Sequence, residues 1–245
     1  KKTKVIMPVS IFGQPSEMNR INKIAKKYNL IVIEDAAQSF GSVYKNKYSC
    51  NLSDIGCTSF FPTKPLGCYG DGGAIFTNNT KLAEICKEIR VHGKNINNKY
   101  ERIGINGRMD TLQCAIVLSK LNIFKKEMKL RNSVGMKYEK LLKKINVKTI
   151  KQSTNSFSVF AQYSIFYDKR NELKKKLSKL GIPTQVYYPK PLNEHKIFKK
   201  YKNFNSETPV SKEVSKTILS LPMSPYLSYD MQKYIVDNIK KIINN

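Results

Sequence analysis

One lysine occupies an unusually constrained stretch of this 245-residue chain. Lys64 lies between Pro62 and Pro65, after an apolar pair and before a glycine cluster, in the stretch TSFFPTKPLGCYGDGGAI at residues 58–75. The prolines restrict the backbone, and apolar neighbours partly desolvate the amine, which lowers its preference for the ammonium form. An amine held in this way can attack a carbonyl and form a Schiff base. The alternative interpretation is a solvated lysine on a tight turn.

The net charge of the chain is strongly positive, but its distribution argues against a nucleic-acid partner. Lysines and arginines number 44 against 18 acidic residues, which gives a formal net charge of +26. Only 6 of the 44 are arginines, and the lysines are spread along predicted helices instead of being grouped with aromatic residues. Base readout and stacking favour arginine and aromatic side chains. We therefore predict a solvated basic surface, whose field would still attract a nucleotide diphosphate.

The cysteines and histidines give no sign of a metal site. The five cysteines form no CxxC pair and lie among apolar neighbours, which is typical of small buried side chains in a reducing compartment. His92 and His195 are the only histidines, and we interpret His92 as a structural residue at a helix end. The chain opens on four polar residues, without a signal-peptide pattern, and no apolar run approaches the roughly 18 residues that cross a bilayer. These observations predict a cytoplasmic protein without a membrane contact.

The first part of the chain predicts a βαβ unit. Residues 4–9 and 30–33 form apolar strand patterns, and between them a helix with one apolar face follows Ser16, which we expect to be its N-cap. Asp35 comes directly after the second strand. Ligands gather at the carboxyl ends of parallel strands, so Asp35 is a candidate site residue.

The remaining elements follow from periodicity and from helix-ending residues. We expect strands at 57–61 and 74–77, helices at 80–91 and 110–121, and a long helix at 123–145. Beyond it we expect a strand at 158–167, a helix at 171–180 ended by Gly181, a short strand at 186–188, a polar loop at 202–209 and a helix from 229. The predicted division is a first domain at 1–122 and a second at 123–245.

Several motifs in order resemble the DegT/DnrJ/EryC1/StrS family of sugar aminotransferases. They are EDAAQS from residue 34, SFFPTKPLGCYGDGGAI from residue 59, GINGRMDTLQCAI from residue 104, FAQYSI from residue 160 and GIPTQVYYPKPLNEH from residue 181. The resemblance implies an α/β fold, the pyridoxal phosphate (PLP)-dependent transferase fold type I. The chain would contain the C-terminal part of the large, mostly parallel-sheet domain and a small α/β C-terminal domain.

The resemblance also implies roles for five residues around pyridoxal 5'-phosphate. Lys64 would be the catalytic lysine that binds the cofactor and moves the proton, and Asp35 would face the ring nitrogen. Gln38 would lie at the ring, Ser59 would bind the phosphate, and Asn106 would reach it from the neighbouring subunit of a homodimer. From the residues alone, other interpretations stay open: Asp35 could be a turn aspartate, Gln38 an exposed loop amide and Ser59 a strand-terminal serine.

Three further residues are candidates for binding a UDP-sugar substrate. Arg108 has a guanidinium fork that suits a carboxylate or phosphate, although a salt bridge to Asp110 is an equal alternative. Tyr187 and Tyr188 match a pair at the nucleotide-sugar pocket of relatives, where the first is often histidine; both are also compatible with a core position. Within the family, these motifs are most similar to those of members that aminate a UDP-linked 3-oxo-glucuronate with glutamate as amino donor. Such members contribute to the synthesis of a surface polysaccharide such as O-antigen. Family members that act on 4-oxo sugars share many of the same motif residues.

The first residues of this chain match a position well after the N-terminus of the family's members. Relatives carry a longer N-terminal portion with a phosphate-binding loop, so we expect a fragment, a truncated product or a degenerate copy, with weak cofactor binding and poor solubility or reliance on a partner chain. The alternative function is an inactive relative that serves as a structural or binding partner. A dehydratase role is disfavoured, because the relatives that dehydrate have histidine where Lys64 stands.

Overall fold

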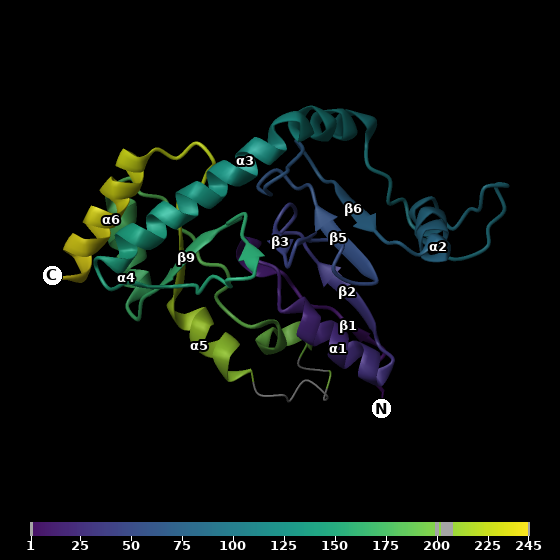
Figure 1. Cartoon of the computed structure of the whole chain (residues 1–245), viewed down its shortest axis with the longest axis horizontal. Helices are drawn as coiled ribbons and strands as arrows, with labels where there is room; N and C mark the ends of the chain where they lie inside the picture. Colours follow the sequence, from purple (N-terminus) through teal and green to yellow (C-terminus); the bar gives the residue numbers. More distant parts are fainter. Residues whose placement is uncertain (1, 199–200, 202–207, 245) are drawn as a thin grey trace. The chain divides into compact units, whose positions relative to one another are not determined.

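The computed structural model describes residues 2–198, 201 and 208–244, which divide into two compact units (Figure 1). Unit 1 comprises Lys1–Asn132 and Gln152–Ala161, and unit 2 comprises Ser133–Lys151 and Gln162–Asn245. The predicted boundary after Asn122 therefore falls ten residues before the division between the units. The ten residues from Gln152 return the chain to unit 1, which the sequence did not predict.

The division falls inside one long helix, α3 (Thr111–Lys143). We predicted two helices, at 110–121 and 123–145, and this was wrong. The joining residues Leu121-Asn122-Ile123 include neither proline nor glycine, so nothing in the backbone stops the helix. Val117, Phe124 and Met128 are buried in the first part, and Val134, Tyr138 and Leu142 in the second.

The central sheet of unit 1 has the strand order β1-β2-β5-β6. Its strands are β1 (Val5–Ile6), β2 (Ile31–Asp35), β5 (Ile55–Ser59) and β6 (Gly73–Phe76). The first three are parallel and β6 is antiparallel to β5. Helix α1 (Met18–Tyr28) connects β1 to β2, which confirms the predicted βαβ unit.

Helix α1 begins differently from the prediction. Ser16 is not its N-cap, because its hydroxyl donates to the carbonyl of Val9 at 3.0 Å, and Glu17 precedes the helix without a side-chain cap bond. The helix ends at Tyr28 and is followed by its C-cap Asn29, which has a left-handed φ of 50° and whose backbone N–H donates to the carbonyl of Ala25. Its buried face packs in a cluster formed by Met18, Ala25, Val32, Tyr44 and Leu52.

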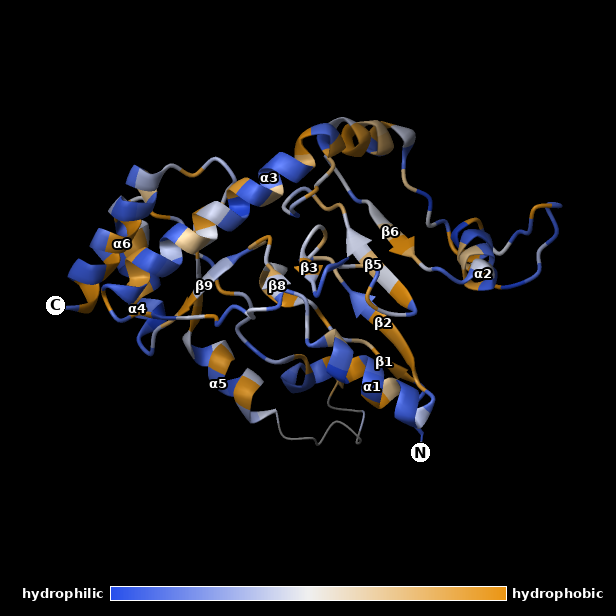
Figure 2. Cartoon of the chain, in the orientation of Figure 1, coloured by the Kyte–Doolittle hydropathy of each residue, from blue (hydrophilic) through white to orange (hydrophobic). Residues whose placement is uncertain are grey.

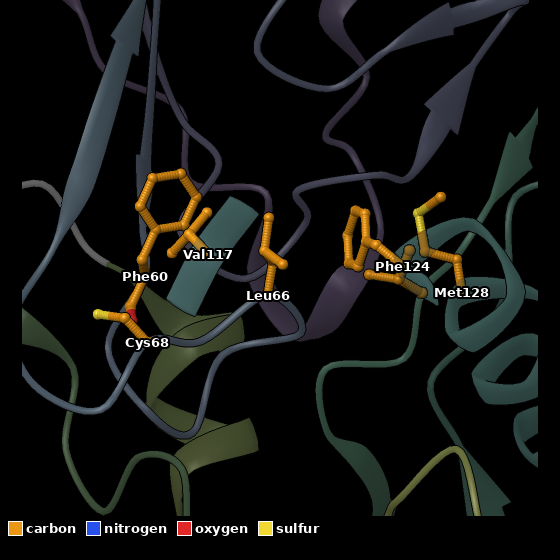
Figure 3. Packing of buried hydrophobic residues seen from close by; sticks show 7 residues of the cluster. Phe60, Leu66, Cys68, Val117, Phe124 and Met128 are labelled. Atoms are coloured by element: carbon orange, nitrogen blue, oxygen red, sulfur yellow. The ribbon is translucent and has the colours of Figure 1, made fainter. Parts of the chain in front are cut away.

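The rest of unit 1 includes a second helix and a small sheet. Helix α2 (Thr80–Arg90) is capped by Asn79, whose side chain accepts from the backbone of Leu82. The small sheet has the order β4-β3-β8, formed by Lys47–Tyr48, Val43–Tyr44 and Ser156–Phe157, and Ile11–Gly13 form a 3-10 turn (η1). A second apolar cluster joins the segment around Lys64 to α3 (Figure 3); it contains Phe60, Leu66, Cys68, Val117, Phe124, Met128 and Val159.

Unit 2 has an antiparallel sheet in the order β10-β9-β7. Its elements are β7 (Lys148–Thr149), β9 (Tyr163–Phe166), β10 (Ile218–Leu221), α4 (Arg170–Lys179), α5 (Pro209–Thr217), α6 (Tyr229–Ile243) and the 3-10 turns η2 (Leu192–Glu194) and η3 (Lys196–Phe198). The sequence did not predict α5 or β10. The predicted strand at 186–188 is absent; Gln185 instead forms an isolated bridge with Ser220. Most of the predicted loop at 202–209 lies outside the described residues.

The surface helices have mixed faces. Figure 2 shows apolar and polar residues interleaved along α1 and α6. In α6, Ile235 and Ile239 are buried. Within the described ranges, no helix combines the length and the apolar character of a membrane span.

Packing around α1 predicts that Met18→Ala lowers the free energy of unfolding by about 2–4 kcal/mol, because it leaves a cavity in a closed cluster. Met7 provides a matched control, since it is 61% exposed and Met18 is fully buried. Met7→Ala should change the free energy by less than about 0.5 kcal/mol. Urea unfolding followed by circular dichroism measures both. Equal losses in the two variants would contradict the assignment of this core.

Candidate functional site

The candidate site begins at the carboxyl ends of β2 and β5. These strands are parallel neighbours, with Asp35 opposite Cys57. Side chains alternate along a strand, so Asp35, Cys57 and Ser59 lie on one face of the sheet. Burial follows the same alternation, because Glu34 and Thr58 are buried whereas Asp35 and Ser59 are half-buried. The sheet therefore brings two predicted site residues to one face and one end.

Lys64 lies in a loop that leaves β5 and returns into β6. The backbone of Lys64 donates to the carbonyl of Phe61 at 2.9 Å, and that of Cys68 donates to the carbonyl of Phe60 at 2.7 Å. Gly67 is required here, since a Cβ at this position would lie 2.6 Å from the carbonyl oxygen of Pro62. The amine of Lys64, a half-buried side chain, forms no hydrogen bond or ion pair with any residue that the structure describes. It is therefore available for chemistry.

Helix α3 holds the second half of this loop. The Nζ of Lys120 donates to the carbonyl of Gly67 at 2.5 Å and lies 4.8 Å from the ring centroid of Tyr69. The Oε1 of Gln113 accepts from the backbone of Tyr69 at 2.8 Å. The sequence gives no local signal for Lys120 or Gln113, because their contacts join segments more than 40 residues apart.

Asp35 has one oxygen engaged in a local turn. Its Oδ1 accepts from the backbone of Ala37 at 3.0 Å, so the predicted alternative of a turn aspartate is part of what it does. Its Oδ2 accepts no hydrogen bond from the described residues. A carboxylate with one oxygen fixed and one open is suited to a cationic or N–H group on a ligand.

Gln38 and Ser59 have defined partners near Asp35. Gln38 is buried, so it is not an exposed loop amide, and its Oε1 accepts from the backbone of Phe12 at 2.7 Å. The hydroxyl of Ser59 accepts from the backbone of Phe61 at 3.2 Å. Since that bond uses a lone pair, the hydroxyl hydrogen of Ser59 remains for an anionic ligand.

Asn106 and Arg108 are exposed on the segment that follows α2. Asn106 bridges to Val91, and the structure has no ion pair between Arg108 and Asp110 among the residues that it describes. The same segment exposes Ile96 and Ile103 almost completely, each at 97%. His92 lies beyond the end of α2, and its backbone donates to the carbonyl of Ile105, in keeping with a structural role.

Tyr187 and Tyr188 belong to unit 2. Their ring centroids are 5.5 Å apart with an edge-on angle of 63°. Tyr187 is half-buried, whereas Tyr188 is 50% exposed and is therefore not a core residue.

A hollow with a volume of about 1190 Å³ lies along β6 and α2. It is lined by both polar and apolar side chains, among them Cys57, Ile75, Cys86 and Arg90. None of the predicted site residues lines it, although Cys57 shares a sheet face with Asp35. Strand β6 is the edge of the sheet among the described strands, so the hollow borders an unpaired edge.

The acidic end of β2 affects the neighbouring thiols. Burial, followed by the charges of Glu34, Cys57 and Asp35, raises the pKa of Cys50 to about 12. Burial, followed by Asp35 and Cys86, also raises the pKa of Cys57. No cluster of histidine, cysteine and acidic side chains that could hold a metal ion occurs in the part of the chain that the structure describes.

Known proteins resemble the whole chain. The sequence profile of the DegT/DnrJ/EryC1/StrS aminotransferase family matches residues 1–240. A UDP-2-acetamido-2-deoxy-3-oxo-D-glucuronate aminotransferase of Pseudomonas aeruginosa is 48% identical over 226 residues, which cover 92% of this chain and 62% of that protein. This chain thus spans less than two thirds of that relative.

Two solved structures share the fold. A DegT DnrJ EryC1 StrS aminotransferase from Brucella abortus has a TM-score of 0.94 at 43% identity, covering 99% of this chain and 65% of that chain. DesV of S. venezuelae, in complex with a ketimine intermediate, has a TM-score of 0.94 at 26% identity, covering 100% of this chain and 66% of that chain. These similarities confirm the predicted fold class.

The raised pKa predicts that Cys50 resists alkylation. With a pKa of about 12, only about one thiol in ten thousand is ionised at pH 8, and the side chain is also buried. Iodoacetamide at pH 8, followed by peptide mass spectrometry, should modify the half-buried Cys86 at least about 100-fold faster. Similar alkylation rates for the two thiols would contradict the burial and the raised pKa assigned to Cys50.

Proposed function

Because the chain belongs to the DegT/DnrJ/EryC1/StrS aminotransferase family, we propose that it carries the catalytic lysine of a PLP-dependent aminotransferase for an oxo nucleotide sugar. The observation that carries the proposal is the arrangement at the ends of β2 and β5. There Asp35 and Ser59 share one sheet face, and the unpaired amine of Lys64 follows in the next loop. This chain covers 62% of the length of the Pseudomonas relative, so the activity is stated as a proposal.

The groups present fit PLP. The open oxygen of Asp35 would pair with the protonated ring nitrogen, since a nearby negative charge favours that form. The hydroxyl hydrogen of Ser59 would bind a phosphate oxygen, and Gln38 would pack beside the ring with its amide oriented by Phe12. When bound, PLP supplies an electron sink for the carbon that loses or gains a proton.

Lys64 would perform two tasks in turn. Its amine would hold the cofactor covalently, and as a free amine it would accept and donate the proton that the reaction moves. Proline residues and the bonds from Lys120 and Gln113 restrict the loop, so little conformational entropy is lost when the amine is positioned.

We propose that Asn106 completes the active site of a second copy of the chain. Asn106 is exposed and belongs to the same segment as Ile96 and Ile103, which are apolar and almost fully exposed. Exposed apolar side chains of this kind favour a protein interface. A homodimer in which each segment completes the neighbouring site would account for both features.

We propose a UDP-linked 3-oxo-glucuronate as substrate and glutamate as amino donor, in the synthesis of a surface polysaccharide such as O-antigen. The support is the 48% identity to the Pseudomonas enzyme named for that substrate. Both substrates carry carboxylates, which suit the exposed fork of Arg108, and the nucleotide diphosphate suits the net charge of +26. The five free thiols suit a reducing compartment, so we assign the activity to the cytoplasm.

Lys64→Ala should abolish covalent attachment of PLP. In the wild-type chain, borohydride reduction followed by peptide mass spectrometry should place the pyridoxyl group on Lys64, and glutamate should convert the cofactor to its amine form. The variant should lose this conversion by at least about 10³-fold, because it lacks the amine that would hold the cofactor and move the proton. Lys125→Ala, at an exposed position of α3, is the matched control and should behave as wild type. A folded wild-type chain without labelling at Lys64 would refute the proposed function.

Arg108→Ala should raise the KM for the carboxylate-bearing substrate by about 10–100-fold, the range expected for loss of a charged hydrogen-bonded pair. Arg20→Ala, at an exposed position of α1, should leave KM unchanged. Steady-state kinetics with matched 3-oxo and 4-oxo UDP-sugars, with and without the uronate carboxylate, measure the effect. Preference for a 4-oxo sugar would move the chain to the alternative substrate class.

A further inference from the structure

Glu34 is an acidic residue inside the protein. It precedes Asp35 in β2, but its side chain points to the opposite, buried face and is fully inaccessible to solvent. Burying a carboxylate is costly unless donors surround it. The hydrogen-bond donors around Glu34 therefore indicate the role of its carboxylate.

Three donors converge on the carboxylate of Glu34. Oε1 accepts from the hydroxyls of Ser10 at 3.1 Å and Ser49 at 2.7 Å, and Oε2 accepts from the backbone of Cys50 at 2.8 Å. Both oxygens are thus acceptors, and the donors come from segments before and after β2. None of these three donors is a cation, so the arrangement is not an ion pair.

The network continues to the backbone of Asp35. Ser10, which donates its hydroxyl to Glu34, also donates its backbone N–H to the carbonyl of Asp35 at 2.9 Å. The backbone N–H of Asp35 donates to the carbonyl of Pro8 at 2.9 Å. The side chain of Glu34 therefore fixes the segment that flanks the backbone of Asp35.

The network also reaches Gln38. The hydroxyls of Ser49 and Ser39 are 2.6 Å apart, and Ser39 follows Gln38 directly. The Oε1 of Gln38 accepts from the backbone of Phe12, two residues after Ser10. The segments at residues 10–12 and 38–39 are thus tied to each other and to one carboxylate.

We propose that Glu34 is a positioning residue that sets the geometry of Asp35 and Gln38 toward the cofactor. An apolar side chain at this position would leave three buried donors without an acceptor, so the carboxylate is the group that holds their segments in one arrangement. It holds the segments at residues 10 and 49–50 directly and the segment at residue 39 through Ser49, on the face of the sheet opposite to the open oxygen of Asp35. The cofactor part of this inference rests on the proposed function.

The first test compares Glu34→Gln with Asp54→Asn by hydrogen exchange of the chain without added cofactor. Glutamine would turn an NH2 group toward one of the donors that now face an acceptor. Asp54 is the matched control, because its Oδ2 accepts from the backbone of Val32 at 2.8 Å, near the start of the same strand. Amides at residues 36–42 should exchange at least about tenfold faster in Glu34→Gln and at the wild-type rate in Asp54→Asn.

The second test measures the dissociation constant of PLP by absorbance titration, with thermal unfolding of each variant as a check on folding. Glu34→Gln should weaken binding by about tenfold, the effect of misplacing one charged contact, whereas Asp54→Asn should not.

Equal effects of the two substitutions in both tests would show that Glu34 is only structural. If Glu34→Gln does not fold, Ser49→Ala removes one donor from the same carboxylate and should show the same pattern in weaker form. A wild-type chain that fails to bind PLP would refute the proposed function, while the exchange test would still decide whether Glu34 orders residues 36–42.

Discussion

The pairing of β2 with β5 is the constraint on which the candidate site depends. It aligns Glu34 with Gly56 and Asp35 with Cys57, so one ladder sets both the buried carboxylate and the half-buried one. Gly56 is needed at this point, because a Cβ there would lie 2.4 Å from the carbonyl oxygen of Cys50. The close approach brings the backbone of Cys50 within reach of Glu34. A shift of the ladder by one residue would reverse the faces of both carboxylates.

Local patterns in the sequence made candidates of two residues that lie in short segments. Asp35 follows a clear strand, and the prolines and glycines around Lys64 mark a rigid loop, so both residues were candidates without a structure, while their roles at a cofactor came from the resemblance. The structure adds that they are joined by neighbouring parallel strands. The roles of Gln38, Ser59 and Asn106 came only from resemblance, since a glutamine, a serine or an asparagine in a loop carries little signal by itself.

Contacts between distant segments explain most of what the sequence did not predict. We predicted two helices in place of α3 because the pattern of its apolar residues changes along the helix. The backbone itself is not interrupted. Ser16 looked like a helix cap, but its hydroxyl bonds to the carbonyl of Val9 instead. The network of Glu34 with Ser10, Ser39 and Ser49 uses residue types that are common in turns, and only the fold shows that they meet.

The bond from Lys120 to Gly67 affects how chemical modification of this protein should be interpreted. Reagents such as cyanate, acetic anhydride or formaldehyde attack any accessible amine, and two amines of different function lie in and beside one loop. Acylation of Lys120 would remove the cation that holds the Gly67 carbonyl and rests on the Tyr69 ring, and the loop would loosen although Lys64 itself was untouched. Inactivation by an amine reagent is therefore informative for this chain only when the modified position has been mapped.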